Sequence, residues 1–215
     1  MARPMMNIAP EKTPPQRRGD LKRKLLIDVG TAIFTQKGFF NTGVKEIVQL
    51  AGVPKGSFYY YFDSKEDYVH EVIGSYAIYF AKKLDRTLSE VSLTPLQRLR
   101  AFTQEATKAV LRFEFKRGCL VGNLGQEMAS LEDDIRVRLL DLLTDWRNRF
   151  KSCIDDAKAA GEISTSVDSQ QLAQFFWSAW EGGVLCAKLE QSTKPLEIAS
   201  TLFIEHMLEP VSPTP

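Results

Sequence analysis

The stretch TGVKEIVQLAGVPKGSFYYYFDSK, residues 42–65, decides the fold. Thr42 is a predicted N-cap, and apolar residues then recur at helical spacing: Val44, Ile47, Val48 and Ala51. Gly52 supplies a tight turn, and Pro54 suits the first turn of a second helix. Two short helices joined by a glycine turn predict a helix-turn-helix, in which the N-terminal end of the second helix points at base edges.

The second helix of this stretch is rich in aromatic residues. Phe58 and Phe62 lie four apart and are predicted to face the core. The three residues between them are then turned variously outward, toward a phosphate backbone: Tyr59, Tyr60 and Tyr61. Ser64 with Asp67 predicts a capping box that opens a long helix, whose first turn holds Lys65. A cation at a helix N-terminus suits an anionic partner outside the protein.

The pattern TGVKEIVQLAGVPKGSFYYYFDSKEDYVHEVI resembles the N-terminal domain of TetR-type transcriptional repressors across roughly residues 20–75. The resemblance implies base contacts by Lys45, Lys55 and Gly56. It implies phosphate contacts by Thr42, Ser57, Tyr59, Tyr60, Tyr61 and Lys65. Tyr61 equally fits half-buried packing, and Lys45 and Lys65 equally fit solvated lysines. Gly43 departs from the pattern, because many relatives carry a threonine there.

Charge is distributed unevenly along the 215 residues. Residues 17–65 hold nine Lys and Arg against four acids, a net charge of +5, so the rest of the chain carries −4 of the total +1. A basic head on a mildly acidic body favours a DNA-binding regulator over a protein that coats nucleic acid non-specifically. With 44% hydrophobic residues, the chain can bury a sizeable core.

The periodicity predicts an all-α fold with three regions. Residues 1–19 form a Pro-rich, disordered basic arm, in which Arg17 and Arg18 are available to touch DNA. Residues 20–65 form the helix-turn-helix domain and residues 66–210 a regulatory and dimerisation domain. The expected helices span residues 20–38, 42–51, 54–62, 64–88, 94–113, 119–130, 168–191 and 195–208, with a break at 114–118. A further helical stripe runs from Ile135 to Ile154 and stops at Gly161.

Several functional classes find no support in the sequence. No signal peptide or membrane span is expected, and three cysteines make a disulfide framework unfavourable, so we expect a cytoplasmic protein without membrane contact. No metal-ligand cluster, phosphate-cradling loop or serine-nucleophile motif occurs, so neither a cofactor nor an enzyme is predicted. A thiol-dependent enzyme is the remaining alternative, but His70 and His206 lie in no catalytic motif.

The last two long helices predict a homodimer. They carry apolar residues at helical spacing, and Gly182 with Gly183 allows close approach of another helix. The resemblance implies that this helix pair forms a four-helix interface with a second copy. A two-headed dimer also matches a palindromic double-stranded operator.

Cys119 is the candidate sensing residue. It follows Lys116 and Arg117 at a predicted helix N-terminus, where cations and the helix dipole lower a thiol pKa. The segments RGCLVGNLGQEMA and WSAWEGGVLCAKLEQSTKPLE are similar to the TetR-type branch that senses electrophiles or oxidants through one cysteine. That resemblance places Lys188 beside the thiol. Packing as a small hydrophobe remains the alternative for Cys119, and is the prediction for Cys153 and Cys186.

A non-covalent inducer is the alternative to thiol chemistry. The resemblance implies an apolar pocket between helices of the body. Its candidate lining residues are Phe102, Phe113, Phe115, Trp146, Phe150, Trp177 and Trp180, all of which also fit a plain core. Asn123, Gln126 and Glu181 are the polar groups expected to orient a ligand. The function implied is a repressor that a small molecule or an electrophile releases from its operator.

Overall fold

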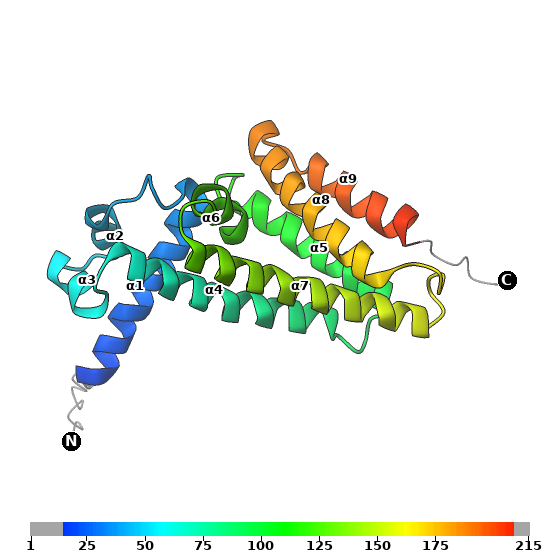
Figure 1. Ribbon diagram of the computed structural model, residues 1–215, viewed down its shortest axis with the longest axis horizontal. Helices are drawn as coiled ribbons and strands as arrows, with labels where there is room; N and C mark the ends of the chain where they lie inside the picture. The colour runs from blue at the N-terminus through cyan, green and yellow to red at the C-terminus, as the bar shows by residue number, and fades with distance from the viewer. Residues whose placement is uncertain (1–14, 209–215) are drawn as a thin grey trace, which may run out of the picture.

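The computed structural model describes residues 15–208, and side chains from residue 19 onward. Regular structure in this part of the chain is helical (Figure 1). The elements are α1 (Pro15–Lys37), α2 (Val44–Leu50), α3 (Lys55–Tyr61), α4 (Lys65–Leu88), α5 (Pro95–Arg112), α6 (Leu120–Met128), α7 (Asp133–Ala159), α8 (Ser169–Glu190) and α9 (Lys194–Thr201). A π-helical turn, η1 (Leu202–Met207), continues α9. The all-α prediction is confirmed.

The head consists of α1, α2 and α3 packed on the first turns of α4 (Figure 1). Its core is aromatic: the ring centroids of Phe58 and Phe62 lie 5.0 and 4.8 Å from that of Tyr68. The Tyr68 hydroxyl donates to the Leu26 carbonyl at 2.6 Å, which ties α4 to α1. Gly52 adopts the left-handed conformation (φ +62°), so the turn between α2 and α3 depends on glycine.

Two details of the head differ from the sequence-based expectations. Helix α1 begins at Pro15, so residues 15–19, expected in the disordered arm, are helical; residues 1–14 of the arm lie outside the described part. The N-cap of α2 is Gly43, not Thr42. Thr42 is only 1% exposed, and its hydroxyl donates to the Gly38 carbonyl at 2.7 Å. Its side chain therefore closes the end of α1.

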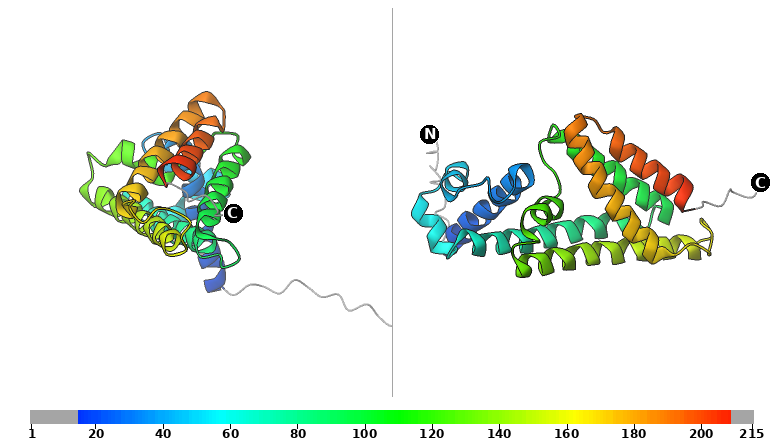
Figure 2. Two further views of the ribbon diagram at one scale, coloured as in Figure 1. Left: turned by 90° about the vertical axis from the view of Figure 1, so that its right-hand side faces the viewer. Right: turned by 45° about the horizontal axis from the view of Figure 1, so that its top comes forward.

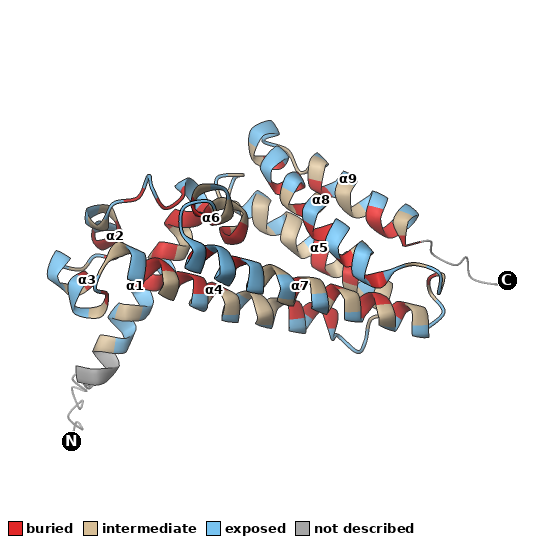
Figure 3. Ribbon diagram, viewed as in Figure 1, coloured by how far each residue is buried: buried red, intermediate tan, exposed pale blue. Residues whose placement is uncertain are grey.

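Helix α4 runs from the head into the body, where α5 and α7 pack against it, α8 packs against α7, and α9 packs against α8 and α5 (Figures 1 and 2). Buried residues line the inward faces of these helices (Figure 3). The predicted caps are present: Ser64 accepts from the Asp67 amide, and Thr94 and Gln97 form a capping box before Pro95. These caps explain where the two helices begin.

The predicted break between α5 and α6 is also present. Glu114 and Phe115 both adopt left-handed backbone conformations, with φ of 51° and 57°. This turn directs the following residues 117–119 back toward the end of α1, where the Gly118 amide donates to the Thr35 carbonyl at 2.8 Å. The loop thereby places Cys119 at the junction of head and body.

None of the helices formed by residues 15–208 is long and apolar enough to cross a membrane. In the same range, no three His, Cys, Asp or Glu side chains gather where they could hold a metal ion.

Candidate DNA-binding face and regulatory cavity

The outer face of α3 presents several predicted DNA-binding residues to solvent. Lys55 and Gly56 are exposed at its N-terminal end, while Tyr59 and Tyr60 are 52% and 80% exposed. Phe58 is fully buried beneath them and fixes the rotation of the short helix. Lys45 is exposed on α2, whereas Ser57 is half-buried. The head therefore holds cations and hydroxyls outward on a rigid aromatic base.

Lys65 does not project freely toward a partner, contrary to its predicted phosphate contact. Its ammonium donates to the Phe39 and Thr42 carbonyls, each at 2.9 Å, and lies 3.9 Å from the centroid of the Phe39 ring. Burial lowers the pKa of Lys65, although Glu66 and Glu127 partly oppose this shift. Lys65 thus holds the loop after α1 against α4, a structural role.

Two further residues with predicted phosphate contacts, Thr42 and Tyr61, also contact the protein itself. The buried Thr42 hydroxyl is used at the end of α1, so the structure does not present it to a phosphate. Tyr61 is half-buried, with its ring 4.8 Å from that of Tyr60 and 6.2 Å from that of Phe62. For Tyr61 the packing alternative describes the position in this structure.

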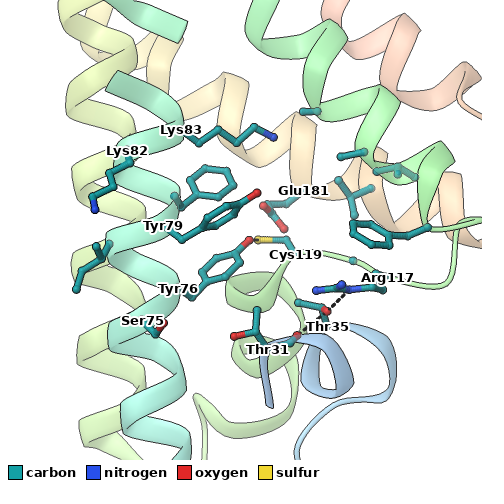
Figure 4. A pocket seen from close by; sticks show the side chains of 18 of the residues that line it. Thr31, Thr35, Ser75, Tyr76, Tyr79, Lys82, Lys83, Arg117, Cys119 and Glu181 are labelled. Atoms are coloured by element: carbon teal, nitrogen blue, oxygen red, sulfur yellow. Dashed lines mark hydrogen bonds between the residues drawn. The ribbon is translucent and has the colours of Figure 1, made fainter. Parts of the chain in front are cut away.

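A cavity of about 580 Å³ lies in the body, bounded by α1, α4, α5, α8 and the loop before α6 (Figure 4). Aromatic side chains form much of its wall: Tyr76, Tyr79, Phe80, Phe113, Trp177 and Trp180. Cationic side chains also line it: Lys24, Lys82, Lys83 and Arg117. The Lys83 ammonium is 3.8 Å from a Glu105 oxygen, and burial lowers the pKa of Lys83. The cavity suits a small molecule with an apolar body and a polar or anionic end.

Only some of the predicted pocket residues line this cavity. Phe113, Trp177, Trp180, Cys119 and Glu181 do. The other candidates lie elsewhere: Phe102, Trp146 and Phe150 are fully buried in the aromatic core, Phe115 packs against that core, Gln126 is exposed, and Asn123 contacts α1. The α4 residues were missed. Tyr76, Tyr79, Phe80 and Lys83 recur at helical spacing, and this pattern could have revealed them.

Cys119 is the N-cap residue of α6 and lines the cavity, as Figure 4 shows. Its predicted low pKa is wrong. Burial raises the pKa of the Cys119 thiol well above its ordinary value, and the Glu181 carboxylate adds to this effect. The Gly122 amide and the Tyr76 hydroxyl, which lies 3.9 Å from the sulfur, act in the opposite direction but more weakly. The resting residue is therefore a protonated thiol.

Lys188, expected beside the thiol, instead lies against the residue before it. A Cβ atom at Gly118 would come within 3.4–3.6 Å of the Lys188 side chain. The charged group at the sulfur is Glu181, whose pKa burial raises to about 7, with a smaller opposing effect of the Cys119 thiol. The structure therefore places Cys119 in the cavity wall, with the Glu181 carboxyl group and not the Lys188 ammonium as the ionisable group at its sulfur.

The other two cysteines differ from each other. Cys153 is buried, its thiol donates to the Pro95 carbonyl at 3.4 Å, and burial raises its pKa to about 12, in agreement with a packing role. Cys186 is exposed on α8, so the prediction that it packs within the chain is wrong. Other exposed apolar side chains near the C-terminal end of the fold are Phe175, Leu185 and Leu189 on α8, Ile198 on α9 and Leu202 on η1.

The segment that carries Cys119 is bonded to the end of α1 by a set of contacts that we call the α1–α6 clasp. The Asn123 amide donates to the Phe34 and Thr35 carbonyls at 3.0 and 2.9 Å. Arg117 donates to the Thr35 hydroxyl at 2.9 Å. Farther along α6, a Glu127 oxygen accepts from the Phe39 and Phe40 amides at 2.7 and 3.1 Å. These contacts satisfy backbone groups at and beyond the helix end.

The helix-turn-helix head and the helical body define a DNA-binding transcriptional regulator. The chain belongs to the TetR family. Residues 26–72 match the model described as bacterial regulatory proteins, tetR family, and residues 95–203 match the tetracyclin repressor-like, C-terminal domain.

Individual relatives agree with this assignment. The transcriptional regulator AcuR of Cereibacter sphaeroides is 42% identical over 213 residues, which cover 95% of this chain and 97% of AcuR. The crystal structure of the regulatory protein TetR from Rhodobacter sphaeroides superposes with a TM-score of 0.84 at 45% identity, covering 86% of this chain and 98% of that one. The reduced form of Escherichia coli NemR superposes with a TM-score of 0.78 at 25% identity, covering 90% and 100%.

Proposed function

We propose that the protein is a cytoplasmic, homodimeric repressor that binds a palindromic operator and is released when a small molecule or an electrophile occupies the cavity beside Cys119. The observation that carries this proposal is the position of the cavity. It lies directly against the segment that the α1–α6 clasp bonds to the head. An occupant that displaces this segment changes the position of α1, and α1 supports the two helices of the reading head.

Release requires that the occupant bind better to a conformation that fits DNA poorly. Asn123 and Glu127 lie one and two turns beyond Cys119 on α6, so a shift of the first turn also moves the groups that hold the end of α1. In a dimer, such a shift changes the spacing of two heads that must contact half-sites about one helical turn, or a multiple of it, apart. The clasp is therefore the proposed path from cavity to DNA.

The homodimer is supported by the exposed apolar surface of α8 and α9. On α8, Leu189 is 75% exposed and Leu185 54%, and Ile198 on α9 is 48% exposed. Exposed large apolar side chains on neighbouring helices are typical of an interface. Light scattering at micromolar concentration is expected to give the mass of two chains. A monomeric mass would contradict the proposal.

The covalent form of the proposal is tested by a limiting dose of N-ethylmaleimide or hypochlorite, followed by intact mass spectrometry and operator binding by fluorescence anisotropy. We expect a modification at Cys119, located by peptide mapping because Cys186 is exposed, and loss of operator binding. Cys119→Ser should stay bound after the same treatment, while Cys186→Ser should behave as the parent does. Release of the Cys119→Ser protein at the parental dose would reject a covalent role for Cys119.

The non-covalent form is the second candidate, favoured by the aromatic wall of the cavity. Ala109 lines the cavity, so Ala109→Phe is expected to fill part of it without removing any operator contact. This variant should bind the operator as the parent does and require a higher concentration of any non-covalent inducer. An unchanged response would show that the inducer acts outside the cavity.

A further inference from the structure

The sulfur of Cys119 is surrounded by one proton acceptor and two donors. The acceptor is Glu181 on α8, whose carboxyl group reaches across to α6: a Cβ atom at Gly122 would come within 2.5 Å of Glu181 Oε2. The donors are the Tyr76 hydroxyl on α4, 3.9 Å from the sulfur, and the Gly122 amide in the first turn of α6. Figure 4 shows the Glu181 and Tyr76 side chains converging on the sulfur inside the cavity.

We propose that Glu181 takes the thiol proton when Cys119 adds to an uncharged alkene conjugated to a carbonyl group, and that Tyr76 and Gly122 hold the developing charge on sulfur. This inference rests on the proposed function, since it assigns the chemistry by which the same cavity is occupied. In this proposal the group that acts on the thiol is the Glu181 carboxylate and not the Lys188 ammonium that the sequence resemblance implied. It also supplies the base that a thiol reaction needs where the described residues place no histidine among the cavity lining.

The step balances without an oxidant or a reductant. The Glu181 carboxylate accepts the proton of the S–H bond, and the sulfur electron pair forms a C–S bond to the β-carbon of the alkene. The electrons of the C=C bond move onto the carbonyl oxygen to give an enolate. Glu181 then returns its proton to the α-carbon, so that S–H has been added across the double bond and the carboxylate is regenerated.

The geometry also explains how the residue stays protected before the alkene arrives. Burial raises the pKa of the Cys119 thiol, and the neighbouring Glu181 carboxylate further opposes a second negative charge, so the resting sulfur keeps its proton. The other titratable or charged side chains that line the cavity are Lys24 and Asp28 on α1, Tyr79, Lys82 and Lys83 on α4, and Arg117 in the loop. Only Glu181 combines a position at the sulfur with a pKa, about 7, that suits proton acceptance near neutral pH.

The test is the rate of N-ethylmaleimide addition to Cys119 in the full-length protein carrying Cys186→Ser, which removes the exposed thiol and serves as the parent here, followed by intact mass spectrometry between pH 5.5 and 9. For the parent, we expect a rate that rises with an inflection near pH 7. Glu181→Gln should lower the rate at pH 7.5 at least ~10-fold and remove that inflection. Glu105→Gln, which removes the carboxylate paired with Lys83 and leaves the groups at the sulfur in place, should leave the rate unchanged.

A purely repelling role of the Glu181 carboxylate predicts the opposite change in the rate of N-ethylmaleimide addition. If the carboxylate acted only as a repelling charge, its removal would lower the thiol pKa, and Glu181→Gln would react as fast as the parent or faster; that result overturns the inference while leaving a covalent sensor intact. Should Glu181→Gln fold poorly, as judged by operator binding, Glu181→Ala with added sodium formate replaces it. Recovery of the rate with formate supports the base, and no recovery opposes it. A parent that forms no adduct at Cys119 rejects the covalent form of the proposed function itself.

Discussion

Two aromatic clusters hold this molecule together, and they serve different ends. The head cluster is formed by Phe34, Phe39, Phe58, Phe62 and Tyr68, with ring centroids 4.8–5.8 Å apart. The body cluster is formed by Phe80, Phe102, Trp146, Phe150, Phe176, Trp177 and Trp180, and is packed as tightly, but three of its members also face the cavity. The head core is filled by its own side chains, whereas the body core borders a cavity of about 580 Å³.

The largest expected effect comes from a substitution in the head cluster. Phe58 is fully buried, and Phe58→Ala leaves a cavity where three aromatic rings meet. We expect a loss of about 3–5 kcal/mol in the free energy of unfolding, measured by urea denaturation. Tyr60→Ala is the matched control: Tyr60 is 80% exposed, so its removal should change stability by less than about 0.5 kcal/mol while weakening operator binding. A loss below about 1 kcal/mol in the free energy of unfolding for Phe58→Ala would show that the head core relaxes around the missing ring and is not rigid.

The next largest effect concerns the body and depends on pH, because it arises from the buried carboxyl group of Glu181. Glu181 has a folded-state pKa of about 7 against an ordinary value of about 4.5, so its contribution to stability is present below pH 4.5 and is lost as the pH rises toward 7. The parent should lose up to about 3 kcal/mol relative to Glu181→Gln across that window, with no further change above it. Urea denaturation of both proteins at several pH values measures this difference. A difference that stays constant from pH 4.5 to 7 would contradict the raised pKa.

Two lysines of the head sharpen the distinction between an exposed reading surface and an internal support. Lys55 is exposed and is predicted to contact a base, so Lys55→Ala should weaken operator binding by about 1–3 kcal/mol, or roughly 5- to 150-fold, with little change in stability. Fluorescence anisotropy over a range of salt concentrations measures the effect.

Lys65 serves as the contrasting position in the same assay. Lys65→Met leaves the Phe39 and Thr42 carbonyls without their donor, so stability should fall by about 1–3 kcal/mol. The slope of log K against log salt concentration should stay the same, because no phosphate contact is removed. A slope that becomes shallower by about one unit would show that Lys65 does contact a phosphate, as the sequence resemblance implied.

The two regions also differ in how far their sequences predict them. The head is specified locally: Gly52, Phe58 and Ser64 each act on neighbours a few residues away, so the turn, the core face and the cap follow from spacing. The cavity is specified by contacts across the chain. Glu181 lies 62 positions from Cys119 in the sequence, and nothing in either local pattern indicates that the two meet.

The cations that precede Cys119 in the sequence led to a wrong pKa prediction for the same reason. Lys116 and Arg117 precede Cys119, yet Lys116 pairs with Glu114 and Arg117 with Thr35, so neither stabilises a thiolate. Likewise, Thr42 and Lys65 have the residue types of phosphate contacts but are used to close the end of α1. Side-chain type fixes what a group can bind, whereas packing decides which partner it reaches.

The smallest expected effect tests whether the loop before Cys119 is under backbone strain that the turns of the head avoid. Positive φ angles in the head occur at Gly38 and Gly52, where they cost little, whereas the loop that leads to Cys119 places Glu114 and Phe115 in that conformation. Glu114 is exposed, so Glu114→Gly relieves about 1–2 kcal/mol of native strain, part of which the greater freedom of the unfolded chain offsets.

We expect Glu114→Gly to raise the melting temperature by about 1–3 °C, as followed by circular dichroism. Glu114→Ala keeps the left-handed cost and should melt with the parent. Phe115→Gly removes a ring that packs against the body core and should melt lower. If Glu114→Gly instead melts below Glu114→Ala, the turn is not strained. The difference between head and body would then lie in the cavity alone, because the loop that positions Cys119 would be as relaxed as the glycine turns of the head.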